Sequence, residues 1–200
     1  EQTADDRWAF TKYDTRGRVI ATGMLNSSAN RQTHQNAAEG ASATEESFEV
    51  DANNAPTGPL FGYSNNAYPN GSLVSESDIY NVYLFDNYYF LNSSSQTHLG
   101  FTSFDSNQRL EVSRGLPTGS KAKVFGGSNP SQMLATVSYY DERARPLQAI
   151  TENHKGGWDR IDTYYNEKGQ VEKTIQYHRY EATSTEHVLS TRFLYHQRSG

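Results

Sequence analysis

Six histidines are the most direct candidates for metal chemistry in this sequence. No two of them lie three to five residues apart, the spacing that places two ligands on one element. The chain has no cysteine, which excludes disulfides, thiolate metal sites and a cysteine nucleophile. We therefore expect no metal ion and no cofactor. Solvated or turn-capping roles are expected for His34, His98, His154, His178, His187 and His196.

Carboxylates offer a second kind of chemistry, because two of them can act as the acid and the nucleophile of a glycosidase. Turn capping explains Asp141 without catalysis. The sequence has no GxSxG, P-loop or GxGxxG motif. A hydrolase is therefore kept only as a further hypothesis, and we predict that the chain is not an enzyme. The acidic residues on or near predicted strand ends are Asp78, Asp86, Asp105, Glu111, Asp141, Asp159 and Asp162.

Two small clusters of acidic and amide side chains could bind calcium. One contains Asp51, Asn53 and Asn54, and the other contains Asp105 and Asn107. Neither belongs to a loop of the EF-hand form. Because Asp and Asn accept hydrogen bonds from the backbone two residues on, we expect turns at both positions.

Aromatic rings could bind carbohydrate, because a flat ring stacks on the face of a sugar. Trp158 lies in HKGGWDR, where two glycines predict an exposed hairpin, and Trp8, Tyr63 and Tyr68 are further candidates. The alternative places these rings in the core with their polar atoms hydrogen-bonded. The core is favoured, and carbohydrate binding is the second functional hypothesis.

Internal similarity is the most informative feature of the chain. Four stretches read FTKYDTRGRVI, VSYYDERARPL, DTYYNEKGQVE and RFLYHQRSG. Each has an aromatic-rich strand before Tyr, then Asp, Asn or His, two polar residues, and Gly, Ala or Ser. A weaker fifth copy begins at Phe104. The tyrosines that anchor the four clear copies are Tyr13, Tyr140, Tyr165 and Tyr195.

The repeat predicts a hairpin turn after each tyrosine. Asp14 can accept a hydrogen bond from the backbone two residues on, and Gly17 can adopt a positive φ at no steric cost. Asn166 and Gly169 can form the same turn.

The copy at Asp141 departs from this pattern. It has Ala144 at the glycine position, where a positive φ is costly, so we expect a turn of another type. Pro146 lacks a backbone donor, so the next strand should start there or lie at a sheet edge.

The stretches KYDTRGRVIATG and YYDERARPLQ resemble the YD repeats of RHS-type proteins. The resemblance extends, in the same order, to the repeat region of large RHS-like proteins of Bacteroidetes-type bacteria. It implies a long β-sheet that spirals into a hollow shell, which encloses a toxin in some members and belongs to surface proteins in others. It implies no catalytic residue. The blocks that carry it are KYDTRGRVIATGML, GYSNNAYP, YNVYLFDNYYFL, GLPTGSKAKV and SYYDERARPLQAITENHKGGWDRIDTYYNEKGQVEKTIQYH.

The composition indicates an ordered β protein with a thin core, since aromatic residues make up 12% of a chain that is only 34% hydrophobic. We predict a mainly β fold of antiparallel hairpin (YD) repeats in a twisted or spiralling sheet, with at most one short helix in an insertion. Within one domain, 1–200, the first repeat spans 1–25, an insertion or degenerate repeats span 26–133, and tandem repeats span 134–200. A helix is expected over 28–39, and strands over 79–91, 121–125, 133–140, 148–152, 158–165, 172–180 and 190–195.

The charge pattern limits the partners. A net charge of −5 without a basic cluster argues against nucleic acid, and no run of 18 apolar residues predicts a membrane span. We predict a non-enzymatic structural and interaction module of a larger exported or cell-surface YD-repeat protein, with no signal visible in this chain. Expected partners are the remainder of the repeat shell, a carbohydrate or protein, and a second copy that pairs through strand edges.

Overall fold

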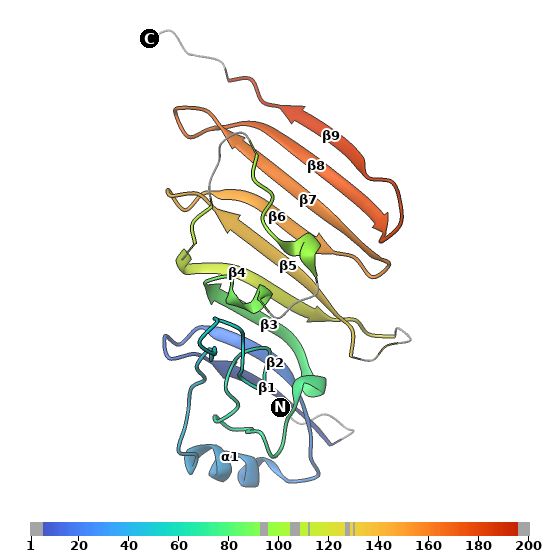
Figure 1. Cartoon of the computed structure of the whole chain (residues 1–200). Helices are drawn as coiled ribbons and strands as arrows, with labels where there is room; N and C mark the ends of the chain where they lie inside the picture. The colour runs from blue at the N-terminus through green and yellow to red at the C-terminus, as the bar shows by residue number, and fades with distance from the viewer. Residues whose placement is uncertain are drawn as a thin grey trace.

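The computed structural model describes residues 6–92, 96–104, 109–111, 113–126, 129 and 131–195. They form one antiparallel sheet of nine strands whose spatial order follows the chain (Figure 1). The predicted mainly β, antiparallel architecture is confirmed, and the sheet is open, with β1 and β9 at its edges. The strands are β1 (Arg7–Tyr13), β2 (Val19–Asn26), β3 (Ile79–Asp86), β4 (Ser113–Lys123), β5 (Met133–Tyr140), β6 (Pro146–Glu152), β7 (Gly156–Tyr165), β8 (Val171–Glu181) and β9 (His187–Arg192).

Among the described residues, helix is limited to α1 (Arg31–Glu39) and the 3₁₀ turns η1 (Glu76–Asp78), η2 (Tyr89–Leu91) and η3 (Thr97–Leu99). The helix expected over 28–39 begins three residues later, because Asn30 caps α1 by accepting a hydrogen bond from the Thr33 amide at 3.0 Å. It ends at Glu39, as predicted, and buries none of its residues. None of these helices has the length and apolar character needed to cross a bilayer.

The region 26–133 contributes the strands β3 and β4 to the sheet, and most of the loops that cover one face of the sheet. The strand expected over 79–91 ends at Asp86, which has φ 73°, and η2 follows. Strand β4 starts eight residues before the predicted 121–125, because the sheet accommodates Pro117 at an irregularity opposite Phe85. The bounds of β5 match the prediction. The weak copy at Phe104 falls largely on 105–108, as do Asp105 and Asn107, outside the described residues.

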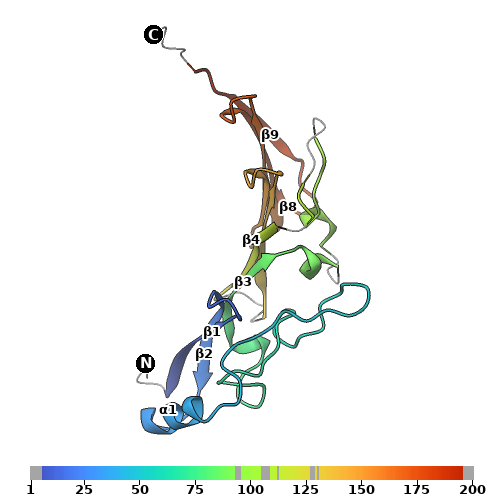
Figure 2. The ribbon, with the colours of Figure 1, turned by 90° about the vertical axis from the view of Figure 1, so that its left-hand side faces the viewer.

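One face of the sheet is covered by loops, which the edge-on view shows on a single side (Figure 2). The strands supply buried apolar residues, and the covering segments 48–74 and 88–101 pack aromatic and leucine side chains onto them. The fit is close at Gly119, where an added Cβ would lie 2.6 Å from the Phe90 ring. The fully buried centre includes Ile20, Leu60, Ile79, Val82, Leu84, Leu99, Val137, Tyr139 and Ile150.

A buried ion pair holds the insertion against β1. The Lys12 ammonium lies 2.7 Å from Glu46 Oε1, and both side chains are inaccessible to solvent. Glu46 also accepts hydrogen bonds from the Ser64 hydroxyl at 2.6 Å and from the amides of Asn66 and Ala67. Burial lowers the pKa of Lys12, while the hydrogen bond and charge of Glu46 oppose that shift. The carboxylate thus joins β1 to two separate parts of the insertion.

Substitution of one partner tests this attachment. Lys12→Met should lower the free energy of unfolding by about 3–5 kcal/mol, because it leaves the Glu46 carboxylate buried without a counter-charge. Urea denaturation of both proteins measures the difference. Lys155→Met, at an exposed turn, is the matched control. A loss for Lys12→Met as small as that of the control would show that the pair does not anchor the insertion.

The turns after Tyr13, Tyr140 and Tyr165 share one hydrogen-bonded form, here called the repeat turn, and the turn predicted after Tyr195 lies outside the described residues. In the first, Asp14 Oδ1 accepts the amides of Arg16 and Arg18, both at 2.9 Å. The backbone of Asp14 pairs with Arg18 and receives the Gly17 amide at 2.8 Å, and Gly17 has φ 72°. Asn166 makes the same contacts with its own loop, where Gly169 has φ 79°.

The expectation of another turn type at Asp141 is wrong. Its Oδ1 accepts the amides of Arg143 and Arg145 at 2.9 Å, and Ala144 adopts φ 59°. The two hydrogen bonds and the hairpin around them offset the steric cost of a positive φ at alanine. Asp51 and Asn153 form the same loop, at positions without a repeat tyrosine.

Each complete repeat turn follows a shift in strand register at its tyrosine. The shifts fall between Lys12 and Tyr13, between Tyr139 and Tyr140, and between Tyr164 and Tyr165. Irregularities of this kind bend a strand and redirect a side chain. The repeat therefore fixes both the loop and the direction of its tyrosine.

The strained alanine gives a test of the repeat turn. Ala144→Gly should raise the free energy of unfolding by about 0.5–1 kcal/mol, because glycine adopts the positive φ without the steric cost. The greater conformational entropy of glycine in the unfolded chain cancels only part of that gain. The reciprocal change Gly17→Ala should lower it by a similar amount. Thermal and urea unfolding measure both. Destabilisation by both substitutions would contradict the shared geometry.

Candidate functional site

Three of the four repeat tyrosines connect a hairpin to the strand before it. Their hydroxyls donate a hydrogen bond to a backbone carbonyl on the neighbouring strand. Burial raises the pKa of Tyr140 and of Tyr165, so both hydroxyls keep their protons at neutral pH. Tyr13 lies on the edge strand, is 44% exposed and makes no such contact within the described residues. The contacts are Tyr140 to Pro117 (2.7 Å), Tyr165 to Pro146 (2.8 Å) and Tyr195 to Val171 (2.8 Å).

Arginine side chains join the repeat turns to neighbouring aromatic rings. The Arg18 guanidinium lies 2.6 Å from both Asp14 and Asp86, and 4.2 Å above the Phe85 ring. Arg145 repeats the arrangement, with its guanidinium on Asp141 and 4.1 Å above the ring of Tyr165. A stacked guanidinium that also binds a carboxylate combines two directional contacts.

The carboxylates of these turns have lowered pKa values. Burial acts to raise the pKa of Asp14 and of Asp86, but hydrogen bonds from Arg18 and from the backbone, together with the charge of Arg18, outweigh it. Arg145 does the same for Asp141. These groups are therefore charged, paired and structural at neutral pH.

Of the four aromatic residues predicted to bind a ligand, Trp8 and Tyr63 lie in the core. Trp8 packs on Leu25 and Val74, and its Nε1 donates to the Ser27 carbonyl at 3.1 Å. Tyr63 is buried in the main core and its hydroxyl donates to the Tyr83 carbonyl at 3.0 Å. Neither ring has a face open to a ligand, which agrees with the core alternative.

The other two rings are half-buried and far apart in the fold. Tyr68 is hydrogen-bonded to His34, whose ring also lies 4.8 Å from that of Trp8. Trp158 lies on β7, within the predicted strand 158–165, but it is half-buried where an exposed ring was expected. Arg160 and Arg179 lie within 6 Å of its ring, at 5.9 and 5.4 Å.

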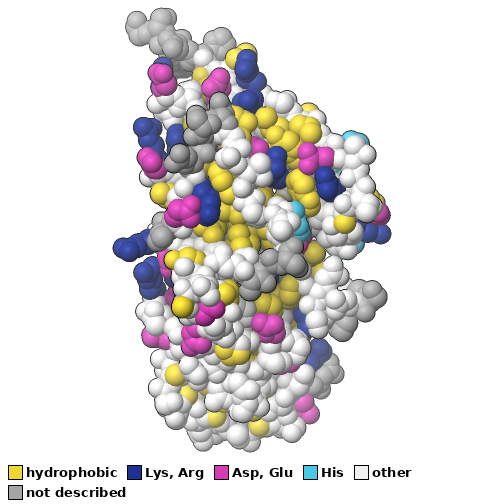
Figure 3. Space-filling view, viewed as in Figure 1, with side chains coloured by type: hydrophobic (Ala, Val, Ile, Leu, Met, Phe, Trp, Pro, Cys, Tyr) yellow, Lys and Arg dark blue, Asp and Glu magenta, His cyan; other side chains and the backbone are white. Residues whose placement is uncertain are grey.

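Cations and aromatic rings alternate across β7 and β8. Arg160 stacks on Tyr177 at 3.9 Å, and Lys173 lies 3.7 Å from the Tyr164 ring centre. Hydrophobic side chains with interspersed Lys and Arg are visible over the sheet on this face (Figure 3). The protein's own cations therefore occupy ring surface that a sugar would need.

Acid–base groups are engaged in similar structural contacts. Burial raises the pKa of Asp162, although the Gln148 amide donates to it at 2.7 Å and Arg160 lies 3.3 Å away. His98 contacts Glu152 at 3.0 Å and helps to hold η3 on the sheet. Among the described residues, no group of three or more His, Asp or Glu side chains is placed to hold a metal ion.

The two sheet edges differ. Every residue of β9 is exposed, including Val188 at 59% and Leu189 at 60%. At the end of β1, by contrast, the Glu46 amide donates to the Tyr13 carbonyl at 2.9 Å, so the insertion covers that part of the edge. The insertion thus covers the Tyr13 end of the β1 edge, whereas no described segment pairs with the outer side of β9.

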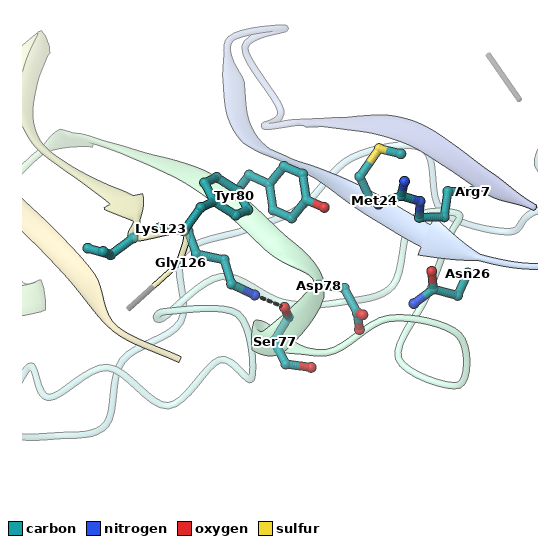
Figure 4. A pocket seen from close by; sticks show the side chains of 10 residues that line it. Arg7, Met24, Asn26, Ser77, Asp78, Tyr80, Lys123 and Gly126 are labelled. Carbon is teal, nitrogen blue, oxygen red and sulfur yellow. Dashed lines mark hydrogen bonds between the residues drawn. The ribbon is translucent and has the colours of Figure 1, made fainter. Parts of the chain in front are cut away.

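A pocket of about 320 Å³ opens where β2 and β4 end and β1 and β3 begin (Figure 4). Its aromatic lining is Tyr80 and Phe125, whose rings meet edge to face with centroids 4.8 Å apart. Lys123 reaches across the pocket and donates to the Ser77 carbonyl. Sequence reasoning did not single out these residues, because they come from four elements and no motif connects them.

Comparisons with known proteins gave no match, whether to a family model, a curated protein or a solved structure. The relationship to YD-repeat proteins is therefore a proposal that depends on the sequence blocks and on the repeated turn.

The paired aspartates predict how stability depends on pH. The pKa values of Asp14, Asp86 and Asp141 are lower in the folded chain than the pKa of about 3.9 in the unfolded chain. These carboxylates therefore add to the free energy of unfolding when the pH is above the unfolded pKa. That contribution is lost as the pH falls through the folded pKa values. Asp86→Asn should lower stability at pH 7 and make the decline in acid less steep. Urea denaturation between pH 7 and pH 2.5 measures both effects.

A variant that lacks the Arg18 guanidinium is the matched partner of Asp86→Asn. Arg18→Met should flatten the same part of the pH profile, since it leaves Asp86 and Asp14 without the guanidinium that lowers their pKa values. Profiles for both variants that run parallel to the wild type would contradict this assignment.

Proposed function

We propose that this chain is a non-enzymatic structural and interaction module, a length of repeat sheet within a larger exported or cell-surface YD-repeat protein. The observation that carries the proposal is the recurrence of one turn with one inter-strand contact. Turn, register shift and tyrosine hydrogen bond occur together at Tyr140 and at Tyr165. Such a unit stabilises its neighbour, which is the design of repeat arrays.

The open edge supports an interaction role. Strand β9 presents exposed valine and leucine side chains and an unpaired backbone row on its outer side. An extended strand that pairs there would satisfy these backbone groups. We propose that β9 is the surface through which the module meets the rest of its shell or a second copy of itself.

The paired state of the carboxylates is the reason for proposing no catalysis. Asp14, Asp86 and Asp141 are bound by arginine, and their lowered pKa values are the opposite of what a general acid needs. The raised pKa of Asp162 belongs to a side chain that is only 1% exposed and bonded to Gln148. The hydrolase hypothesis therefore receives little support.

Edge pairing predicts a concentration-dependent homodimer. Light scattering coupled to size exclusion should show the isolated chain shifting from monomer to dimer as its concentration rises. The double substitution Val188→Lys/Leu189→Lys should keep it monomeric, since charged edge residues oppose strand pairing. Circular dichroism verifies that the variant is folded.

Gln176→Lys, which adds charge to the exposed surface of the interior strand β8, is the control and should dimerise like the wild type. A wild-type chain that remains monomeric at high concentration would contradict self-pairing. Dimerisation of the β9 variant would instead place the contact elsewhere.

A further inference from the structure

We infer that the pocket at the ends of β2 and β4 is a carbohydrate-binding site, with Phe125 as its stacking surface and Tyr80 as the ring that supports it. This inference goes beyond the structural role proposed above and does not depend on β9. It also differs from the carbohydrate hypothesis drawn from the sequence, which centred on Trp158.

Phe125 is the unusual residue of the pocket. Its ring is 65% exposed, although an aromatic side chain of this size is normally covered in a folded protein. The Tyr80 ring meets it at an interplanar angle of 89° and braces its position. In such a contact the edge of one ring meets the face of the other, so at least one flat face of Phe125 is clear of Tyr80. A pyranose packs its C–H groups on such a face.

Polar side chains surround the aromatic pair. Arg7 and Asn26 face each other across β1 and β2, while Asp78 and Lys123 line the opposite side. Together they offer charged and amide donors and carboxylate and amide acceptors. The hydroxyls of a saccharide require both kinds of partner around one apolar face, and this lining provides them.

Lys123 is held in place for such a role. Its ammonium donates to the Ser77 carbonyl and lies 5.8 Å from the centre of the Tyr80 ring. The hydrogen bond uses one of three donors, so the others can serve a ligand. The pocket volume of about 320 Å³ lies at the small end of ligand sites, which suits one or two sugar units.

Charge favours a saccharide over a nucleic acid. Aromatic rings beside Arg and Lys can also stack on nucleobases. Here the described lining has only two cations, Arg7 and Lys123, with Asp78 between them, and the chain carries a net charge of −5, so a phosphate backbone lacks the row of basic groups that it needs.

The test is a glycan array of neutral and acidic oligosaccharides, probed with the whole chain. Calorimetric titration of the strongest glycan then compares the variants. Phe125→Ala should weaken binding about tenfold or more, because it removes the stacking face. Phe125→Leu keeps an apolar side chain without a flat ring and should weaken binding as well. Asn26→Ala should weaken it severalfold.

Two controls locate the site. Tyr180→Ala removes another exposed aromatic side chain, on β8, and should bind like the wild type. Trp158→Ala should also bind normally. Because Phe125 is exposed, its substitution should leave the thermal unfolding temperature unchanged, so a loss of binding reports on contact and not on folding.

Three results would overturn the inference. One is the absence of glycan binding anywhere on the array. Another is binding that Trp158→Ala abolishes and Phe125→Ala leaves intact. The third is binding of single-stranded oligothymidine that depends on Phe125 while no glycan binds.

Discussion

The structure depends on one side-chain oxygen in each repeat turn. Asp14, Asp141 and Asn166 each hold two backbone amides of their own loop with Oδ1. This fixes the loop and its residue with positive φ. The same loop at Asn153 has no shift in strand register, so the oxygen alone does not set the register. The shift occurs where a repeat tyrosine precedes the loop, and there the turn and the tyrosine together determine how successive hairpins are joined.

A single-layer sheet cannot bury its own apolar face, so other segments of the chain must cover that face. The insertion provides the cover for β1 to β6 through aromatic rings and through the Lys12–Glu46 pair. Buried ion pairs add little stability in themselves, yet they are costly to break, so they make an attachment specific. The loops cover less of strands β7 to β9. On that part of the sheet, arginine and lysine side chains lie over aromatic rings and take the place of the loops.

Sequence reasoning succeeded where the determinants are local. The helix end at Gly40 and the bounds of β5 follow from residues that lie next to one another in the chain. It failed where distant residues decide the outcome. Asp86 ends β3 in contact with Arg18, 68 residues away, and nothing in the local pattern indicates that. Strand β4 contains loop-forming residues, Gly115 and Pro117 among them, and this part of it pairs with β3 only through irregular steps in register.

The candidate site shows the same limit. Sequence spacing directed attention to Trp158, whose position beside two glycines is a local feature. The pocket with Phe125 requires the ends of strands far apart in the chain to meet. No motif connects its lining residues, so only the folded structure shows that they lie together.

The contrast between the two edges has a consequence for assembly. A sheet open on both sides can add copies without limit and grow into a fibre. Here the insertion covers the edge of β1 near Tyr13, whereas every residue of β9 is exposed. Two copies that join β9 to β9 use the same surface on each partner and leave no equivalent surface exposed. Association of this kind stops at two, because a two-fold contact uses the bare β9 edge of both copies.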